Sequence, residues 1–195
     1  MHAPQDKMKK REIQIMSGEE MSEHLEQVIT LDQLCLSSEY VTSLEKLKAR
    51  FYANKRSFVS IFCDHILGGY VNFFPIHADT LAQVREDGLD NDIDFDGSDV
   101  LPWSKTTPTD LYLITIAVSP EHRGSQVTRL LVQAFISELK ALREEGYLFD
   151  RMYAMVVTQD GQRFLGRLGF VPDPQSESLW VADSNELCLL RPRDQ

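Results

Sequence analysis

The stretch SPEHRGSQVTRLLVQAF, residues 119–135, has the composition of an anion-binding turn that leads into a helix. Arg123 supplies a positive charge, Gly124 permits a tight turn, and Ser125 and Thr128 supply hydroxyl donors. The first backbone N–H groups of a helix have no partners within it and point along the positive end of its dipole. The turn therefore predicts a pyrophosphate site. The alternative is an ordinary strand-to-helix turn, in which one glycine is common.

The stretch DIDFDG, residues 92–97, raises the question of a metal site. Four positions match the opening of an EF-hand calcium loop: Asp92, Asp94, Asp96 and Gly97. The match then ends, because the twelfth position is Trp103 instead of a bidentate glutamate and no helices are expected on either side. An edge strand fits better, with Ile93 and Phe95 alternating with aspartates and Phe95 anchoring the loop. We therefore expect no metal.

The chain has 195 residues, enough for one domain with a proper core, and its 43% apolar and 26% charged residues are ordinary for a globular protein. Its net charge is −10, and residues 76–110 contribute −7, with nine acidic side chains against Arg85 and Lys105. Such a field repels a nucleic-acid backbone and attracts a cation. We therefore expect no nucleic-acid partner, and the acidic segment is either a solvated loop or an attractor for a cationic substrate.

The expected location of the protein depends on two kinds of segment, a membrane-spanning run and a secretory signal. No apolar run approaches the ~20 residues that span a bilayer, so we expect no membrane association. Residues 1–16 carry lysines without a following apolar stretch, which argues against a secretory signal and favours the cytoplasm. Cys35, Cys63 and Cys188 lie far apart among apolar neighbours, which favours buried free thiols. The pattern does not decide between a monomer and a homodimer.

Hydrophobic periodicity predicts an α+β fold. We expect residues 1–10 to be disordered and residues 11–195 to form one domain. Strands are predicted over residues 12–16, 57–63, 67–74, 111–118 and 151–157, with a closing strand over 186–190. Helices are predicted over residues 17–31, 41–53, 80–85, 125–145 and 160–167. Ser17 and Glu20 form the capping box of the first helix, and Gly146 ends the long one.

The order of these elements, together with IAVSPEHRG at 116–124 and RFLGRLGFVP at 163–172, resembles the GNAT superfamily of acyl-CoA N-acyltransferases. The resemblance runs from about residue 12 to residue 191. It implies a mixed, mostly antiparallel central sheet of about six to seven strands flanked by helices, with residues 76–110 as an acidic insertion. It also implies acetyl-CoA as the cosubstrate.

The resemblance assigns the residues that hold acetyl-CoA. The strand edge at Ile116, Ala117 and Val118 would pair with the pantetheine arm. The turn would hold the pyrophosphate through Arg123, Gly124, Ser125, Gln126, Val127 and Thr128. Thr158 stands where the family frequently has an asparagine.

The sequence departs from the family at three positions. Gln126 and Thr128 replace small residues, often glycine, that let phosphate approach the backbone closely. The N–H donors remain, so we expect a working turn with an altered grip. Leu165 replaces a tyrosine thought to protonate the departing sulfur, so a water or another hydroxyl would have to be the acid. His122, beside the turn, is expected to be solvated.

The family often uses a carboxylate on its central strand as the base. The corresponding position, eleven residues before Arg123, is Tyr112, and Asp110 shares its face if the strand extends that far. An amine arrives as ammonium and must lose a proton, which a carboxylate or a water wire can accept. Asp110 and Tyr112 are therefore the candidate catalytic residues. The alternatives are a strand-entry turn residue and a core-edge aromatic.

Two functions of different class fit the sequence. The first is an N-acetyltransferase that transfers an acetyl group from acetyl-CoA to the amine of a small, cationic acceptor by direct attack in a ternary complex. The second is a GNAT-fold acyl-CoA-binding or regulatory protein without turnover, which Gln126, Thr128 and Leu165 favour. Acetyl-CoA binding, followed by CoA release with a panel of amines, discriminates between them.

Overall fold

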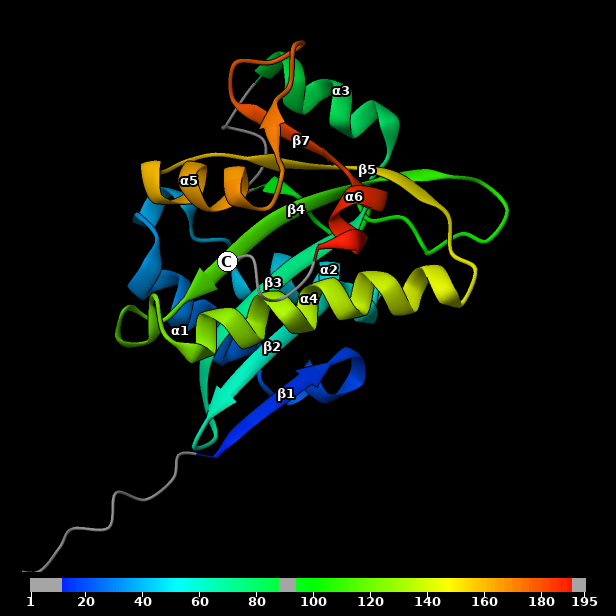
Figure 1. The fold of residues 1–195 in the computed structure, drawn as a ribbon. Coiled ribbons are helices and arrows are strands. Elements are labelled where there is room, and N and C mark those ends of the chain that lie inside the picture. Colours follow the sequence, from blue (N-terminus) through cyan, green and yellow to red (C-terminus); the bar gives the residue numbers. More distant parts are fainter. Residues whose placement is uncertain (1–11, 88–93, 191–195) are drawn as a thin grey trace, which may run out of the picture.

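A computed structural model describes residues 12–87 and 94–190, and these form one seven-stranded sheet with helices on both faces (Figure 1). The strand order is β1-β2-β3-β4-β5-β7-β6. Every neighbouring pair is antiparallel except β4 and β5, which are parallel. The strands are β1 (Ile13–Ser17), β2 (Phe58–Cys63), β3 (Ile66–Pro75), β4 (Thr109–Val118), β5 (Phe149–Met155), β6 (Val171–Pro172) and β7 (Leu179–Asp183). The predicted α+β fold and strand number are confirmed.

The helices divide the core into clusters on the two faces of the sheet. They are α1 (Leu25–Cys35), α2 (Leu44–Ala53), α3 (Ala78–Asp87), α4 (Gln126–Glu144), α5 (Gln159–Arg167) and α6 (Ser184–Leu189). Buried side chains of α4, α5 and α6 pack on one face. On the other face, α1 and α2 cover one region, and α3 with residues Phe95 and Val100 covers the next.

The long helix α4 forms where its periodicity predicts it. Its buried stripe includes Leu131, Phe135 and Leu139, which face the sheet across β2 and β3. The Ser125 hydroxyl caps the helix by accepting from the Val127 N–H. Beyond its end, Gly146 has φ +91°, a conformation that favours glycine.

Strand β4 contains a bulge that changes the face its side chains occupy. Its register against β3 shifts between the pairs Phe73↔Leu113 and Asn72↔Thr115, so Ile114 is an extra residue. In an unbroken strand, Leu113 and Ala117 would share a face. Instead, Leu113 packs in the α4 cluster and Ala117 in the cluster under α1 and α2. The bulge therefore turns the second half of β4 toward α1 and α2.

Two predicted elements are wrong in detail. The helix expected over residues 17–31 is divided: a 3-10 helix (Gly18–Glu23) follows the capping box of Ser17 and Glu20, and α1 begins after His24. Residues 186–190, expected to be the closing strand, lie in or just after α6. The helix forms because the Asp183 carboxylate caps it by accepting from the Asn185 N–H at 2.7 Å.

The acidic segment is attached to the domain by Phe95, as expected. Its ring is 3% exposed and packs edge-on against Phe74 and Tyr112. Its carbonyl accepts a 2.7 Å hydrogen bond from the buried guanidinium of Arg50. The predicted edge strand does not form over its described part, Asp94–Asp96, and Asp92 and Ile93 lie outside the described residues. Within the described ranges, no helix is long and apolar enough to cross a membrane.

We predict that Phe95→Ala lowers the free energy of unfolding by about 3 kcal/mol, the usual cost of emptying a buried aromatic site. The measurement is urea denaturation followed by circular dichroism. Val171→Ala, at a side chain 57% exposed on β6, is the control and should change stability by less than about 0.5 kcal/mol. A Phe95→Ala variant as stable as the control would mean that the acidic segment does not depend on this anchor.

Candidate active site

The central feature of the site is the point where β4 and β5 separate. The two strands pair through Leu113↔Ala154 and no further, whereas β4 continues beside β3 to Gly69↔Val118. The backbone edge of β4 from Ile114 to Val118 therefore has no strand partner on the β5 side among the described residues. Unpaired N–H and C=O groups along such an edge can bind an extended chain. Ile116, Ala117 and Val118 all lie on this edge.

The predicted anion turn follows β4 directly. Gly124 has φ +67°, which a residue with a side chain rarely adopts. Ser125 and Thr128 both donate hydrogen bonds to the His122 carbonyl, at 2.6 and 2.9 Å. Their hydroxyls therefore shape the turn, and the backbone N–H groups at the start of α4 remain the candidate anion donors, apart from that of Val127, which donates to the Ser125 hydroxyl.

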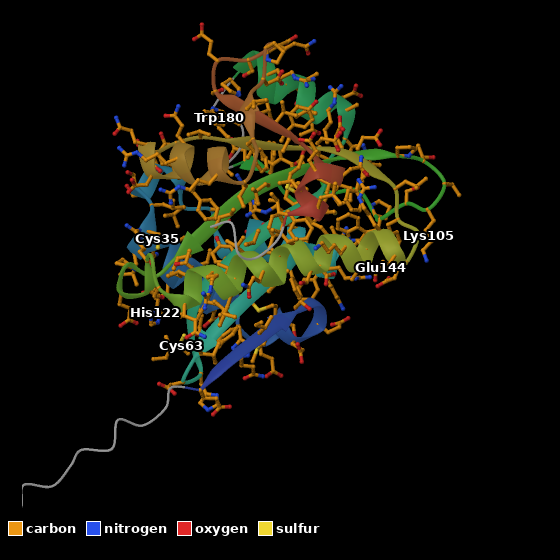
Figure 2. The ribbon with its side chains drawn as sticks, in the orientation of Figure 1. Cys35, Cys63, Lys105, His122, Glu144 and Trp180 are labelled. Atoms are coloured by element: carbon orange, nitrogen blue, oxygen red, sulfur yellow. The ribbon has the colours of Figure 1, made fainter. Side chains whose placement is uncertain are left out.

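Arg123 does not extend over the helix start. It is exposed, and its Nε lies 3.4 Å from the carbonyl oxygen of Val118. The same carbonyl accepts from the Cys35 thiol at 3.3 Å. His122 differs from expectation: it is 5% exposed, and its ring packs beside Gly68, where an added Cβ would lie 3.1 Å from it. Figure 2 shows Cys35, Cys63 and His122 together at this end of the sheet.

A cavity of about 410 Å³ lies between the start of α4 and α5. It is lined by Gly124, Ser125, Gln126, Thr128, Arg129, Val132, Phe164, Arg167 and Leu168. The volume is within the range of small-molecule sites. Gln126, one of the lining residues, is exposed. Arg129 from α4 and Arg167 from α5 add positive charge to the cavity, whereas Arg123 lies against the Val118 carbonyl.

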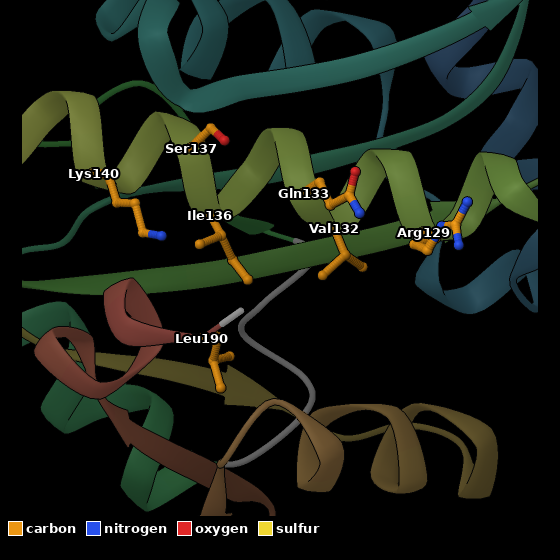
Figure 3. A pocket seen from close by; sticks show the side chains of 7 residues that line it. All are labelled: Arg129, Val132, Gln133, Ile136, Ser137, Lys140 and Leu190. Carbon is orange, nitrogen blue, oxygen red and sulfur yellow. The ribbon is translucent and has the colours of Figure 1, made fainter. Parts of the chain in front are cut away.

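A second, much smaller pocket continues along α4 (Figure 3). Its volume is about 30 Å³, and it shares Arg129 and Val132 with the larger cavity. Leu190 faces α4 across this pocket (Figure 3). The space is about that of one water molecule, so the larger cavity is the ligand-sized one.

Thr158 and Leu165, the two α5 positions considered in the sequence, are not among the residues that line the cavity. The Thr158 hydroxyl caps α5 by accepting from the Gly161 N–H at 3.0 Å. Leu165 is 6% exposed and packs in the α4 cluster, so it places an apolar side chain there. Arg129 and Arg167 were not singled out from the sequence, because only their spatial convergence distinguishes them from other helical arginines.

The two candidate catalytic residues lie away from the turn. Asp110 is the second residue of β4, roughly 26 Å along the strand from Val118 at 3.3 Å per residue. Burial raises the pKa of Asp110, and hydrogen bonding and charge from Arg151 oppose that rise. Tyr112 is fully buried between Phe74 and Phe95. Neither is brought to the cavity, although both lie on the strand that separates from β5.

No metal site emerges from the described geometry. Within residues 12–87 and 94–190, no group of three or more His, Cys, Asp or Glu side chains is arranged to hold an ion. Asp94, from the calcium-like stretch, forms an ion pair with Lys46. Gly97 packs so closely that an added Cβ would lie 2.9 Å from the Ala49 carbonyl oxygen. These residues thus have structural contacts of their own.

Comparison with known proteins identifies the family. A model of the acetyltransferase (GNAT) family matches residues 25–170. The chain belongs to the GNAT family. Membership of this family indicates acyl-CoA-dependent acyl transfer as the general chemistry of the chain. No curated protein matches the sequence.

Solved structures share the GNAT fold at low sequence identity. A GNAT-like decarboxylase, GphF, in complex with isobutyryl-CoA is 13% identical, with a TM-score of 0.59 over 88% of this chain and 99% of that one. The PaiA N-acetyltransferase from Thermoplasma acidophilum, in complex with coenzyme A, is 16% identical, with a TM-score of 0.53 over 87% and 96%. Ard1 from Thermoplasma volcanium is 13% identical, with a TM-score of 0.56 over 88% and 97%. At these identities, the likeness concerns the fold.

We predict that Ser125→Ala lowers the free energy of unfolding by about 1 kcal/mol, because the α4 N-cap is lost. Ser125→Asn, which keeps a capping oxygen, should retain most of that stability. Ser137→Ala, at an exposed position of the same helix, is the matched control. Chemical denaturation checks all three variants, and equal stability of the Ala variants at 125 and 137 would exclude a capping role.

Proposed function

We propose that this protein transfers an acetyl group from acetyl-CoA to the amine of a small acceptor by direct attack in a ternary complex. The observation that carries the proposal is the unpaired β4 edge from Ile114 to Val118, which leads directly into the turn that lines the 410 Å³ cavity. Family membership supports the acyl-CoA chemistry.

The described residues fit acetyl-CoA in three ways. The β4 edge at Ile116, Ala117 and Val118 offers backbone groups for the amides of the pantetheine arm, apart from the Val118 carbonyl, which already accepts from Cys35 and Arg123. The α4 start, with Gly124 and the N–H groups that follow it, suits the pyrophosphate. Arg129 and Arg167 add charge at the same cavity. Acetyl-CoA supplies an activated acyl group when bound.

The residues of the chain itself would bind acetyl-CoA, orient it and polarise its thioester carbonyl. A backbone N–H on the unpaired part of β4 would stabilise negative charge on the thioester oxygen. The α4 turn would fix the position of the cosubstrate, so that the acyl group meets the acceptor where β4 and β5 separate. Thr158 would contribute at the α5 end of the groove. With Leu165 apolar, water would protonate the departing sulfur.

The two arginines provide the sharpest test of cosubstrate binding. We predict that Arg129→Ala and Arg167→Ala each weaken acetyl-CoA binding about tenfold, since each removes one charge-assisted contact. Arg163→Ala is the control, because that exposed α5 arginine pairs with Asp160 outside the cavity. Titration calorimetry measures the three variants, and equal losses in all of them would indicate a diffuse charge effect.

CoA release with a panel of amines separates the acetyltransferase from the alternative of a GNAT-fold binding or regulatory protein. Acetyl-CoA binding without CoA release from any amine supports the binding protein. Absence of binding rejects both functions.

For the acceptor, we propose a small cationic amine with more than one charge, such as a polyamine-like molecule. The net charge of −7 over residues 76–110 supports this class. Asp110 is roughly 13 Å along β4 from Ile114, at 3.3 Å per residue. It is therefore suited to hold a remote ammonium group while another amine reacts. Tyr112, between them, is fully buried and would pack beneath that path.

The acceptor class predicts a salt dependence. Raising ionic strength from 0.05 to 0.3 M should increase KM several-fold for a diamine and leave KM for an uncharged amine unchanged, because salt screens the field. Asp110→Asn should raise KM for the diamine about tenfold. Asp79→Asn, at an exposed site in the same segment, is the control. Equal salt effects on both amines, with an unaffected Asp110→Asn, would reject the cationic acceptor.

A further inference from the structure

The two edges of the sheet differ in how well they are protected against pairing with another chain. The edge strand β6 has two residues, and one of them is Pro172, which has no N–H to donate. The other edge strand, β1, has five residues, IQIMS, without a charge, a proline or a register shift against β2. It lies at the margin of the molecule, and no described strand pairs with its outer side (Figure 1). Since short strands, prolines, charges and bulges are the usual protections of an edge, β1 is an open one.

The hydrogen bonds of Glu12 determine which backbone groups of β1 point outward. The Asp64 N–H donates to the Glu12 carbonyl, and the Glu12 N–H donates to Asp64 Oδ1, both at 3.0 Å. The residues of an antiparallel strand alternate between bonding to one neighbour and to the other. Gln14 therefore also bonds to β2, and the N–H and C=O groups of Ile13 and Ile15 point away from it.

Two copies of β1 can satisfy these outward groups in each other. In an antiparallel pair centred on Gln14, Ile13 of each copy lies opposite Ile15 of the other, so the outward N–H and C=O groups all find partners. A centre at Ile15 would instead set Ile13 opposite Ser17. The Ser17 N–H already faces the Glu20 carboxylate, at 3.5 Å. The register centred on Gln14 thus uses the groups that remain open.

Exposed isoleucine side chains accompany the open edge on one face of the sheet. Ile13 pairs with Cys63 and Cys63 pairs with Ile66, so all three side chains share the face on which α4 packs. Ile13 is 36% exposed, Ile15 49% and Ile66 68%. Pairing through Gln14 would set Ile13 of each copy beside Ile15 of the other, and cross-strand pairs of β-branched residues stabilise a sheet.

The charges before and after β1 are complementary between two antiparallel copies. In the sequence, Lys9, Lys10 and Arg11 precede β1, whereas Glu20 and Glu23 follow it and are exposed. Antiparallel pairing brings the start of each β1 to the end of the other, so opposite charges meet at both ends. The net charge of −10 repels two copies at long range, and this local attraction opposes that repulsion.

We propose that this protein forms a symmetric homodimer through β1, in which the two sheets join across a twofold axis at Gln14. The same surface of both copies forms the interface. The inference does not depend on acetyl transfer, because β2 and β3 separate β1 from β4. Pairing of five-residue strands buries less than the roughly 1,200–2,000 Å² of a standard interface. We therefore expect a dimer that dissociates on dilution.

Sedimentation equilibrium of the full chain over a range of concentrations tests the dimer. Ile15→Lys places a charge on both sides of the axis and should weaken dimerisation about a hundredfold, since each of the two symmetric contacts contributes about tenfold. Val171→Lys, at a 57% exposed position of the opposite edge strand, is the matched control and should dimerise as the parent does. A parent that stays monomeric up to about 1 mM, or a dimer that Ile15→Lys leaves intact, overturns the proposal.

A disulfide tests the register without a charge at the edge. Residues opposite each other without shared hydrogen bonds have Cα atoms about 4.5 Å apart, so Gln14→Cys should cross-link two copies under mild oxidation. Met16→Cys would lie roughly 13 Å from its counterpart, at 3.3 Å per residue, and should not cross-link. The parent, with its three free cysteines, gives the background. No cross-link at position 14, or equal cross-linking at 14 and 16, overturns the register.

Amide hydrogen exchange reports on the backbone groups themselves. Between a dilute and a concentrated sample, exchange of the Ile13 and Ile15 N–H groups should slow about tenfold or more, because only the dimer gives them acceptors. The Gln14 N–H, which bonds to β2 in both states, is the internal control. Unchanged exchange at Ile13 and Ile15, in samples that sediment as monomer and dimer, places the interface elsewhere and overturns the proposal.

Discussion

The parallel pairing of β4 with β5 ends at Leu113, while β4 continues beside β3 for the rest of its length. The other features of the site depend on this separation. Among the described residues, it leaves the β5 side of β4 without a strand partner beyond Leu113, a state that buried strands elsewhere avoid because unmatched N–H and C=O groups cost free energy. The bulge at Ile114 lies beside the separation and sends Thr115 to one face, while α4 and its turn cover the other. Strand β4 therefore contributes residues to both faces of the sheet at this point.

The α4 turn departs from the family motif in its side chains, and its tight backbone conformation depends on residues other than those that depart. Gly124 supplies the positive φ, and the hydroxyls of Ser125 and Thr128 tie the turn to the His122 carbonyl. The larger side chains at 126 and 128 thus do not close the turn. Arg123 lies against the Val118 carbonyl, and Arg129 and Arg167 line the cavity instead. Positive charge at a phosphate site can come from several directions, because Coulomb attraction has no strict geometry.

The sequence predicts those features that depend on local pattern. The hairpin of β2 and β3, the buried β4, and α4 with Ser125 at its start all follow from periodicity and capping, and they fold as expected. The division of the first helix at His24 and the helical residues 184–189 were missed, since short segments take their conformation from tertiary contacts and caps that periodicity does not reveal. The turn was predictable from its residues, but the buried hydrogen bond between Tyr70 and Asp32 was not. These two residues are separated by 38 positions in the sequence and meet only through the packing of α1 on β3.

The acidic segment is physically connected to the buried pair of Asp32 and Tyr70. Phe95 covers Tyr112, the position at which the family often places its carboxylate, and a charged group there would lie in an apolar cluster at high cost. The carbonyl of the same Phe95 holds Arg50, whose charge stabilises the carboxylate of Asp32. The acidic segment therefore has two effects. The ring of its Phe95 covers Tyr112, and the carbonyl of the same residue holds Arg50, whose charge favours the buried carboxylate of Asp32.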